Sequence, residues 1–180
     1  MGDDISKGED LNSDKGFNEL VLNYGPRIYR TVRGMVGTHE TADDIVQETF
    51  LRAYKNRKSF RGEAEIGTWL IRIALNLVYS KSRRKKIFSF TSIDEYSDMI
   101  AADHPLPEEN IMEEERRVFV ENALWQLPDK QRAVFVLRMY EDKRFKEIAS
   151  IMGTSESASR ANFHQALSKL KKLALEKNQL

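Results

Sequence analysis

The sequence predicts an all-α protein built from two small helical domains that are joined by an acidic, flexible linker. Apolar residues recur at the 3.6-residue spacing of helices on both sides of residues 88–112, and no strand pattern of useful length appears. Near the C-terminus, a turn containing Gly153 separates two helical patterns, which predicts a helix-turn-helix. We therefore expect a disordered tail at 1–15, one domain at 16–87, the linker at 88–112 and the helix-turn-helix domain at 113–180.

The formal net charge of +1 hides a segregation into basic, acidic and basic segments. Residues 52–86 hold eleven Lys and Arg against two Glu, whereas residues 89–121 have a net charge of −8. Residues 143–177 are basic again, with a net charge of +5. This order favours two modules that face nucleic acid, separated by a connector of a different kind.

Composition excludes several other classes of protein. The 180 residues include no cysteine, so disulfides and thiolate metal sites are excluded. The N-terminus is polar and acidic, unlike a signal peptide, and no stretch approaches the roughly 20 apolar residues of a membrane span. We expect a cytoplasmic protein without membrane insertion.

No residue constellation predicts catalysis. Asp44 and Glu48 are four residues apart, but no His or third carboxylate joins them, so a solvated helix face is the simpler interpretation. The glycines do not have phosphate-loop spacing. We expect no metal, no cofactor, no small-molecule substrate and no enzymatic activity.

The first domain begins with a helical pattern from Phe17 to Val32, in which Gly25-Pro26 predicts a break or kink. A second helix is expected to start at Thr41 as N-cap, with Asp43 and Asp44 near its positive end.

Residues 60–86 begin as an irregular segment and continue as an apolar helix from about Thr68. A helical wheel separates an expected core face from a polar stripe. The core face holds Leu70, Ile73, Ala74, Leu77 and Val78. The stripe holds Arg72, Asn76, Tyr79 and Arg83, with Trp69 at its border. Cations beside aromatic rings suit phosphates and unpaired bases, although a core helix with a charged tail would show the same pattern.

The second domain follows weakly periodic residues that include Pro105 and Pro107. Pro128 predicts the start of one helix, and Thr154 or Ser155 predicts the cap of the last. In a helix-turn-helix, the start of the second helix faces the major groove. The residues expected on that face are Ser157, Arg160, Ala161, His164 and Gln165. A helical hairpin with a solvated polar face is the alternative.

Several motifs occur in order along residues 15 to 175. They are the runs 42–54, 60–62 and 68–74, then Asn76, 123–124, 127–128, Arg132, 147–149, Gly153 and Ser155. In this order and spacing, the chain resembles bacterial sigma factors of the extracytoplasmic-function group within the sigma-70-like family. The resemblance implies that the protein directs RNA polymerase to promoters and helps to melt the start site.

The resemblance also implies three surfaces. The 41–54 helix would dock on the β′ clamp coiled coil of core RNA polymerase through Asp43, Asp44, Gln47, Glu48 and Leu51. The −10 element would meet Arg61, Trp69, Arg72, Asn76, Tyr79, Ser80, Arg83 and Arg84. The −35 element would meet Ser157, Ala158, Arg160, Ala161, His164 and Gln165. An anti-sigma factor is a further expected partner.

Two departures from the family pattern bear on specificity. Ser80 stands where an Asp is frequent, and Ser159 stands where an apolar residue commonly packs. A buried Ser159 hydroxyl would need a partner, and the carbonyl one turn back is the expected one. These departures leave the promoter sequence undetermined.

The linker length bears on the free state. About 25 flexible residues span about 27 Å, whereas elements about 25 base pairs apart lie roughly 85 Å apart. We therefore expect the free protein to be more compact than the form bound to polymerase, which holds the two modules apart. The free protein should then bind promoter duplex weakly. A helix-turn-helix regulator that acts without polymerase is the alternative, and it predicts tight duplex binding.

Overall fold

The computed structural model describes residues 11–89 and 111–177, and every element in these two ranges is helical. The N-terminal module holds α1 (Asp14–Arg33), α2 (His39–Asn56), the short 3-10 helix η1 (Arg57–Ser59) and α3 (Ile66–Ser89). The C-terminal module holds α4 (Ile111–Trp125), α5 (Asp129–Met139), α6 (Phe145–Met152) and α7 (Glu156–Lys177). The all-α prediction is confirmed, whereas most of the predicted linker, residues 90–110, and residues 1–10 of the predicted tail lie outside the described residues.

Helix α1 runs without a break through Pro26, so of the predicted break or kink at Gly25-Pro26 the break is wrong. Proline removes one backbone donor, which would have bonded the carbonyl of Leu22 one turn earlier. Leu22 is 75% exposed, so water can reach that part of the helix. Ser13 caps α1 by accepting a hydrogen bond of 3.1 Å from the backbone N–H of Gly16.

Helix α2 begins three residues earlier than the sequence predicts. Thr38 is the N-cap, with extended backbone angles, and its hydroxyl oxygen accepts from the Thr41 N–H at 3.1 Å. Both threonines suit a cap, and the earlier one takes the role while its hydroxyl also donates to the Thr41 hydroxyl oxygen at 2.9 Å. Asp43 and Asp44 therefore lie beyond the first turn of α2.

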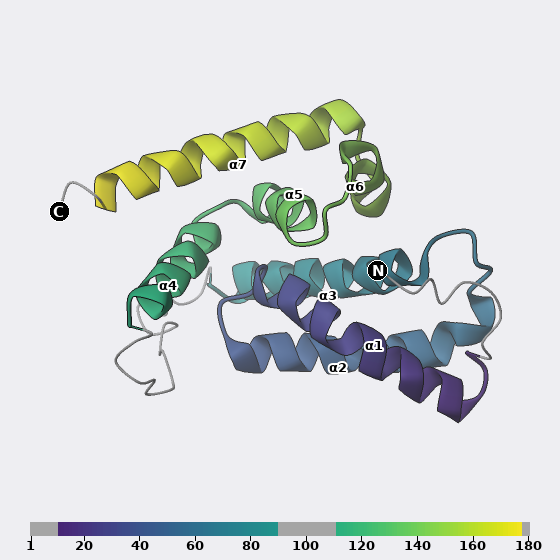
Figure 1. Ribbon diagram of the computed structural model, residues 1–180. Helices are drawn as coiled ribbons and strands as arrows, with labels where there is room; N and C mark the ends of the chain where they lie inside the picture. Colours follow the sequence, from purple (N-terminus) through teal and green to yellow (C-terminus); the bar gives the residue numbers. More distant parts are fainter. Residues whose placement is uncertain (1–10, 90–110, 178–180) are drawn as a thin grey trace.

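Helix α3 lies between the α1–α2 pair and the C-terminal helices (Figure 1). Leu70, Ala74 and Val78 are buried as predicted. Ile71 and Leu75 are buried too, at 0% and 3% exposure, whereas Ile73 and Leu77 are only partly buried. The buried arc is rotated from the prediction because two modules, rather than one, cover α3.

The helix-turn-helix forms as predicted. Gly153 ends α6 in the left-handed conformation, with φ of 64°, which glycine adopts without steric cost. Ser155 caps α7 by accepting from the Ala158 N–H at 3.1 Å. Ser159 is 1% exposed, and its hydroxyl donates to the Ser155 carbonyl at 3.2 Å, which confirms the partner expected one turn back.

One apolar core crosses the boundary between the modules. It joins Leu75 of α3 with Val136 of α5 and Ile148 of α6. A smaller cluster of Leu124, Leu127 and Ala166 fixes α4 and α7 within the C-terminal module. The two domains are therefore packed against each other in this structure.

Candidate nucleic-acid interface

The polar stripe of α3 is divided between solvent and the C-terminal module. Asn76, Arg83 and Arg84 are exposed, as is Arg61 in the loop before α3. Arg72, by contrast, donates from Nη2 to the hydroxyl oxygen of Ser150 on α6 at 2.8 Å. The sequence predicts Arg72 and Arg83 on one face of α3, but only part of that face is exposed to solvent in the structure.

Tyr79 lies on the covered side of α3. Burial raises the pKa of its phenol to about 12, and the nearby Asp129 carboxylate acts in the same direction. Its hydroxyl is buried and has no hydrogen-bond partner within residues 11–89 and 111–177. One turn further, Ser82 donates a hydrogen bond of 2.7 Å to Asp129 at the start of α5.

The loop before α3 is held at both ends. Phe60 and Trp69 pack with ring centroids 5.0 Å apart, and Gly62 takes the left-handed conformation with φ of 70°. Glu65 accepts a hydrogen bond of 2.8 Å from the Lys143 ammonium group, and this bond lowers the pKa of Glu65. The loop thus presents Arg61 next to an aromatic pair, a suitable setting for an unpaired base.

The outer face of α2 combines acidic, amide and apolar side chains. Asp43, Asp44, Gln47 and Leu51 are exposed, Leu51 by 55%, and Glu48 is partly exposed. Asp44 forms an ion pair of 3.0 Å with Lys81 of α3. The Asp44 carboxylate is therefore held in place by another residue of the N-terminal module. A mixed face with an exposed leucine is typical of a protein interface.

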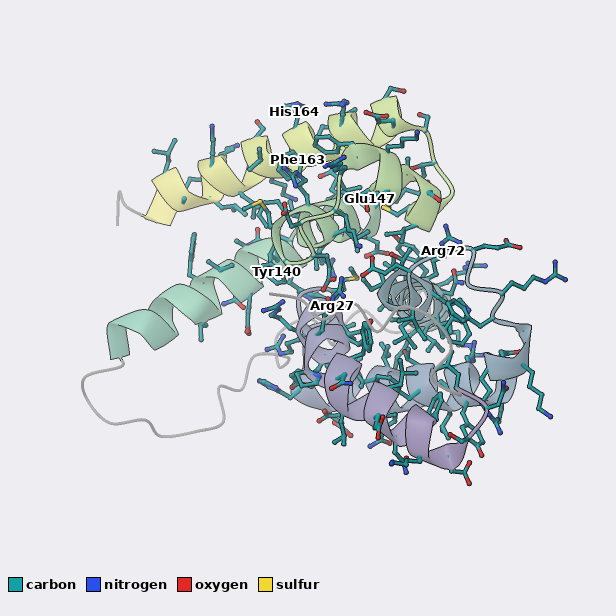
Figure 2. The ribbon with its side chains drawn as sticks, turned by 45° about the vertical axis from the view of Figure 1, so that its right-hand side comes forward. Arg27, Arg72, Tyr140, Glu147, Phe163 and His164 are labelled. Carbon is teal, nitrogen blue, oxygen red and sulfur yellow. The ribbon has the colours of Figure 1, made fainter. Side chains whose placement is uncertain are left out.

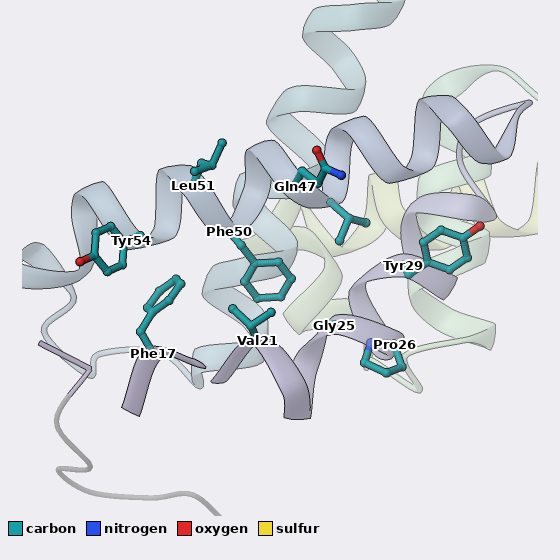
Figure 3. Close-up of a pocket in the computed structure, with 10 residues that line it drawn as sticks. Phe17, Val21, Gly25, Pro26, Tyr29, Gln47, Phe50, Leu51 and Tyr54 are labelled. Atoms are coloured by element: carbon teal, nitrogen blue, oxygen red, sulfur yellow. The ribbon is translucent and has the colours of Figure 1, made fainter. Parts of the chain in front are cut away.

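An apolar groove of about 710 Å³ runs beside this face, between α1 and α2 (Figure 3). It is lined by Phe17, Val21, Gly25, Pro26, Tyr29, Val46, Gln47, Phe50, Leu51 and Tyr54. The sequence analysis did not predict the groove, because Gly25 and Pro26 were interpreted only as a break or kink in the helix. The available signal was the position of Gly25 and Pro26, whose side chains are small or absent, inside a continuous apolar helical pattern.

The outer face of α7 carries the residues expected at the major groove. Ser157, Arg160, Ala161, His164 and Gln165 are exposed, and Ala158 is half-buried. His164 projects from the outer side of α7, away from the N-terminal module (Figure 2). Arg160 donates to Glu156 at 2.6 Å and lies 4.8 Å from the centroid of the Phe145 ring.

Gln165 accepts a hydrogen bond of 2.9 Å from Gln131 of α5. Phe163 points inward, where its ring lies 6.0 Å from that of Phe135 and 5.5 Å from that of Phe145. These contacts fix the register of α7 on the module, so its exposed residues are held on a rigid support.

Neither a metal-binding cluster nor a membrane-spanning helix is found among the described residues. Within residues 11–89 and 111–177, no three His, Asp or Glu side chains gather in a way that could hold a metal ion. In the same described segments, no helix combines the length and the apolar character needed to cross a membrane.

Two family models match the chain. The model for sigma-70 region 2 matches residues 20–87, which contain the stripe on α3 and the outer face of α2. The model for sigma-70 region 4 matches residues 114–170, which contain the helix-turn-helix. ECF RNA polymerase sigma factor SigW of Bacillus subtilis (strain 168) is 32% identical over 93% of this chain and 91% of that protein.

The chain belongs to the extracytoplasmic-function group of RNA polymerase sigma factors. It is also similar to the ECF RNA polymerase sigma-E factor of Escherichia coli (strain K12), with 30% identity over 90% of this chain and 86% of the relative. This sigma factor therefore acts in promoter-specific transcription initiation. A helix-turn-helix regulator that works without polymerase is not favoured.

Solved structures support the fold of this sigma factor. The sigma factor RpoE from Bartonella quintana, solved with the anti-sigma factor NepR, superposes with a TM-score of 0.70 at 22% identity, over 89% of this chain and 97% of that chain. CnrH, solved with the cytosolic domain of CnrY, gives a TM-score of 0.65 at 25% identity, over 90% of this chain and 89% of that one. The helical fold is thus shared.

Proposed function

We propose that this sigma factor uses three separate faces, one for core RNA polymerase and two for promoter DNA. The observation that carries the assignment is the position of three surfaces with different chemistry on α2, α3 and α7, the one on α3 being exposed only in part. The α2 face is acidic and partly apolar, the α3 stripe is basic and aromatic, and the start of α7 is polar with one arginine.

The α2 face binds the β′ clamp coiled coil. Gln47 and Leu51 are central to it, because both also line the apolar groove and so join polar and apolar contacts. Asp43, Asp44 and Glu48 supply negative charge around them. A buried apolar anchor with a polar rim is the usual arrangement of an interface hot spot.

The α3 stripe and the loop before it hold the unpaired strand of the −10 element. Asn76 is exposed and can donate and accept hydrogen bonds at a base edge. Trp69, Tyr79 and Ser80 lie along the same helix, and Arg61, Arg72, Arg83 and Arg84 supply positive charge for phosphates. Duplex opening is driven by the free energy of binding the unpaired strand, so the factor itself needs no catalytic residue.

The start of α7 reads the −35 element in the major groove. Arg160 has the geometry for two hydrogen bonds to a guanine edge, and Gln165 suits an adenine edge. Ser157, Ala158, Ala161 and His164 contribute the remaining contact surface. The contacts of Arg160 with Glu156 and of Gln165 with Gln131 hold both side chains before DNA arrives.

We further propose that the protein works in the cytoplasm, without a cofactor, and that an anti-sigma factor controls it. The RpoE structure contains its anti-sigma factor, which supports the same kind of partner here. A partner that covers the α2 groove would compete with polymerase for Gln47 and Leu51.

Transcription from a randomised promoter library tests the function. Core RNA polymerase is assayed with and without the protein, and the transcripts are sequenced. We expect a distinct set of promoters to be stimulated, with a shared pair of elements about 25 base pairs apart. If no promoter in the library is stimulated, the proposed function is wrong.

A further inference from the structure

A hydrogen bond between two side-chain amides joins α7 to α5, the helix that precedes the helix-turn-helix. Nε2 of Gln131 on α5 donates to Oε1 of Gln165 on α7 at 2.9 Å. Gln165 is one of the residues assigned to the −35 element, whereas Gln131 has no assigned role. The contact lies at the surface of the C-terminal module, so it belongs to the surroundings of the DNA-binding face rather than to the core.

The two helices hold this contact on a rigid support. Helix α5 packs against α7 (Figure 1). Arg132, the residue after Gln131, is only 6% exposed and donates from Nη2 to the carbonyl oxygen of Leu127 at 2.8 Å. Ala166, the residue after Gln165, is fully buried. Because both neighbours are anchored in the same module, the two glutamines keep their relative positions.

The orientation of a glutamine amide decides which base atoms it can bond. Its Oε1 only accepts hydrogen bonds, and its Nε2 group only donates them. Gln131 occupies one of the two acceptor sites of Oε1 in Gln165. Within the part of the chain that the structure describes, no residue accepts a hydrogen bond from Nε2 of Gln165. The donor end of this amide is therefore the end left for DNA.

The base edges in the major groove differ in the groups that they offer to such an amide. Guanine presents the acceptors N7 and O6, cytosine presents the N4 donor group, and adenine presents one of each kind. An amide that turns its donor end toward DNA should therefore favour guanine over cytosine. Adenine stays compatible, because its N6 group can donate to the second acceptor site of Oε1.

We propose that Gln131 is a specificity-determining residue for the −35 element, because it orients the amide of Gln165 so that the donor end faces DNA and guanine is favoured over cytosine at the base pair that Gln165 reads. Gln131 acts through Gln165, so it is a positioning residue and need not touch DNA. The proposal rests on the −35 role of Gln165. It goes beyond that role because it names a residue outside the helix-turn-helix and the chemistry of the preferred base.

The position of the partner distinguishes this contact from an ordinary solvated pair. Arg160 bonds Glu156 of its own helix, four positions away, so the two side chains move together. Gln165 instead bonds a residue of another helix, 34 positions away, which fixes its amide relative to the module. When DNA covers the face, water is excluded and a hydrogen bond in its place becomes harder to break. The amide orientation is then kept during recognition.

Two variants reverse or keep the direction of the hydrogen bond. In Gln131→Glu the carboxylate only accepts, so Gln165 must turn Nε2 toward it and present Oε1 to DNA. In Gln131→Lys the ammonium group only donates, so the original orientation persists. At the base pair read by Gln165, we expect the ratio of guanine to cytosine to fall at least about fivefold in the first variant and to stay within about twofold in the second.

The assay uses the full-length variants with core RNA polymerase. A promoter that the wild-type protein stimulates is synthesised with its −35 element randomised, and the transcripts are sequenced. The base pair read by Gln165 is the one whose preference is lost in Gln165→Ala. Lys130→Gln is the matched control, because Lys130 is exposed beside Gln131 and the change lowers the charge as Gln131→Glu does. It should leave the guanine to cytosine ratio unchanged, and circular dichroism checks that all variants fold.

Each other outcome overturns the proposal in a recognisable way. An unchanged ratio in Gln131→Glu, or an equal fall in Lys130→Gln, would show that Gln131 does not set the base preference. A fall in Gln131→Lys instead of Gln131→Glu would show the opposite amide orientation. If Gln165→Ala changes no base preference while transcription continues, the −35 role of Gln165 is wrong and the proposal falls with it. Failure of the proposed function is separate, since no promoter would then be stimulated by the wild-type protein.

Discussion

Arg132 of α5 donates a hydrogen bond of 2.9 Å from Nη1 to the carbonyl oxygen of Met35, which lies 97 positions earlier in the chain. Its Nη2 donates to the carbonyl oxygens of Leu127 at 2.8 Å and Trp125 at 3.1 Å. The guanidinium also lies 4.2 Å from the centroid of the Trp125 ring. One buried side chain thus ties together the α4–α5 turn and the loop after α1.

Arg132→Ala should therefore lower the free energy of unfolding by about 2–4 kcal/mol, because three carbonyl groups lose their donor in a buried setting. Arg132→Lys should recover little of this loss, since an ammonium group cannot reproduce the planar fork. Urea denaturation measures both variants, with Lys130→Ala at an exposed neighbouring position as the control. A loss below about 1 kcal/mol for Arg132→Ala would contradict the structural role.

Asn76→Ala should impair promoter opening more than polymerase binding, with little effect on stability because Asn76 is exposed. Permanganate reactivity of unpaired thymines measures opening, and core binding is measured in parallel. Leu75→Ala, at a neighbouring residue with 3% exposure, should instead cost roughly 2–5 kcal/mol of stability. Leu77→Ala should also mainly destabilise, but by less, since Leu77 is only partly buried.

Leu51→Asp should weaken binding to core RNA polymerase by at least about tenfold, in line with loss of an apolar anchor from an interface. Leu51 is 55% exposed, so folding should be preserved. Leu175→Asp places the same charge at a leucine of α7 that is 64% exposed and remote from the groove. Binding is measured by fluorescence anisotropy. Equal affinities of the two variants for core RNA polymerase would contradict the assignment of the α2 face to the polymerase interface.

The Glu65–Lys143 ion pair predicts a pH dependence of stability. The pKa of Glu65 is lowered in the folded state, first by the hydrogen bond from Lys143. Its contribution is therefore present above the ordinary value near 4.5 and is lost as the pH falls through the lowered pKa. Glu65→Gln should shrink the drop in Tm between pH 7 and pH 3, measured by calorimetry, and an unchanged drop would contradict the role of this ion pair.

Ser159→Ala should change the free energy of unfolding by no more than about 1 kcal/mol. The Ser155 carbonyl that accepts the Ser159 hydroxyl also accepts the Ser159 backbone N–H, at 3.0 Å, so it keeps a partner. Thermal denaturation measures the change. A loss above about 2 kcal/mol would show that the hydroxyl is required where related chains commonly place an apolar side chain.

The sequence by itself predicted the all-helical fold, the turn at Gly153, a cap at Thr154 or Ser155 and the partner of the Ser159 hydroxyl. These features depend on residues within one or two helical turns of each other, so local spacing is sufficient to predict them. It did not predict the start of α2 correctly, because Thr38 and Thr41 are both acceptable caps and residue type alone does not distinguish them.

The family motifs also predicted the three faces, because each motif residue implies a role by resemblance, and these roles remain predictions. Only the tertiary structure showed that Arg72 and Tyr79 are covered while Asn76 stays exposed. The reason is distance along the chain. Glu141 bonds Arg27 across 114 positions, and a pattern of charges in the sequence does not predict which distant residues will form an ion pair. Periodicity predicts that a helix has a buried side, but the number of surfaces that cover the helix is decided by packing.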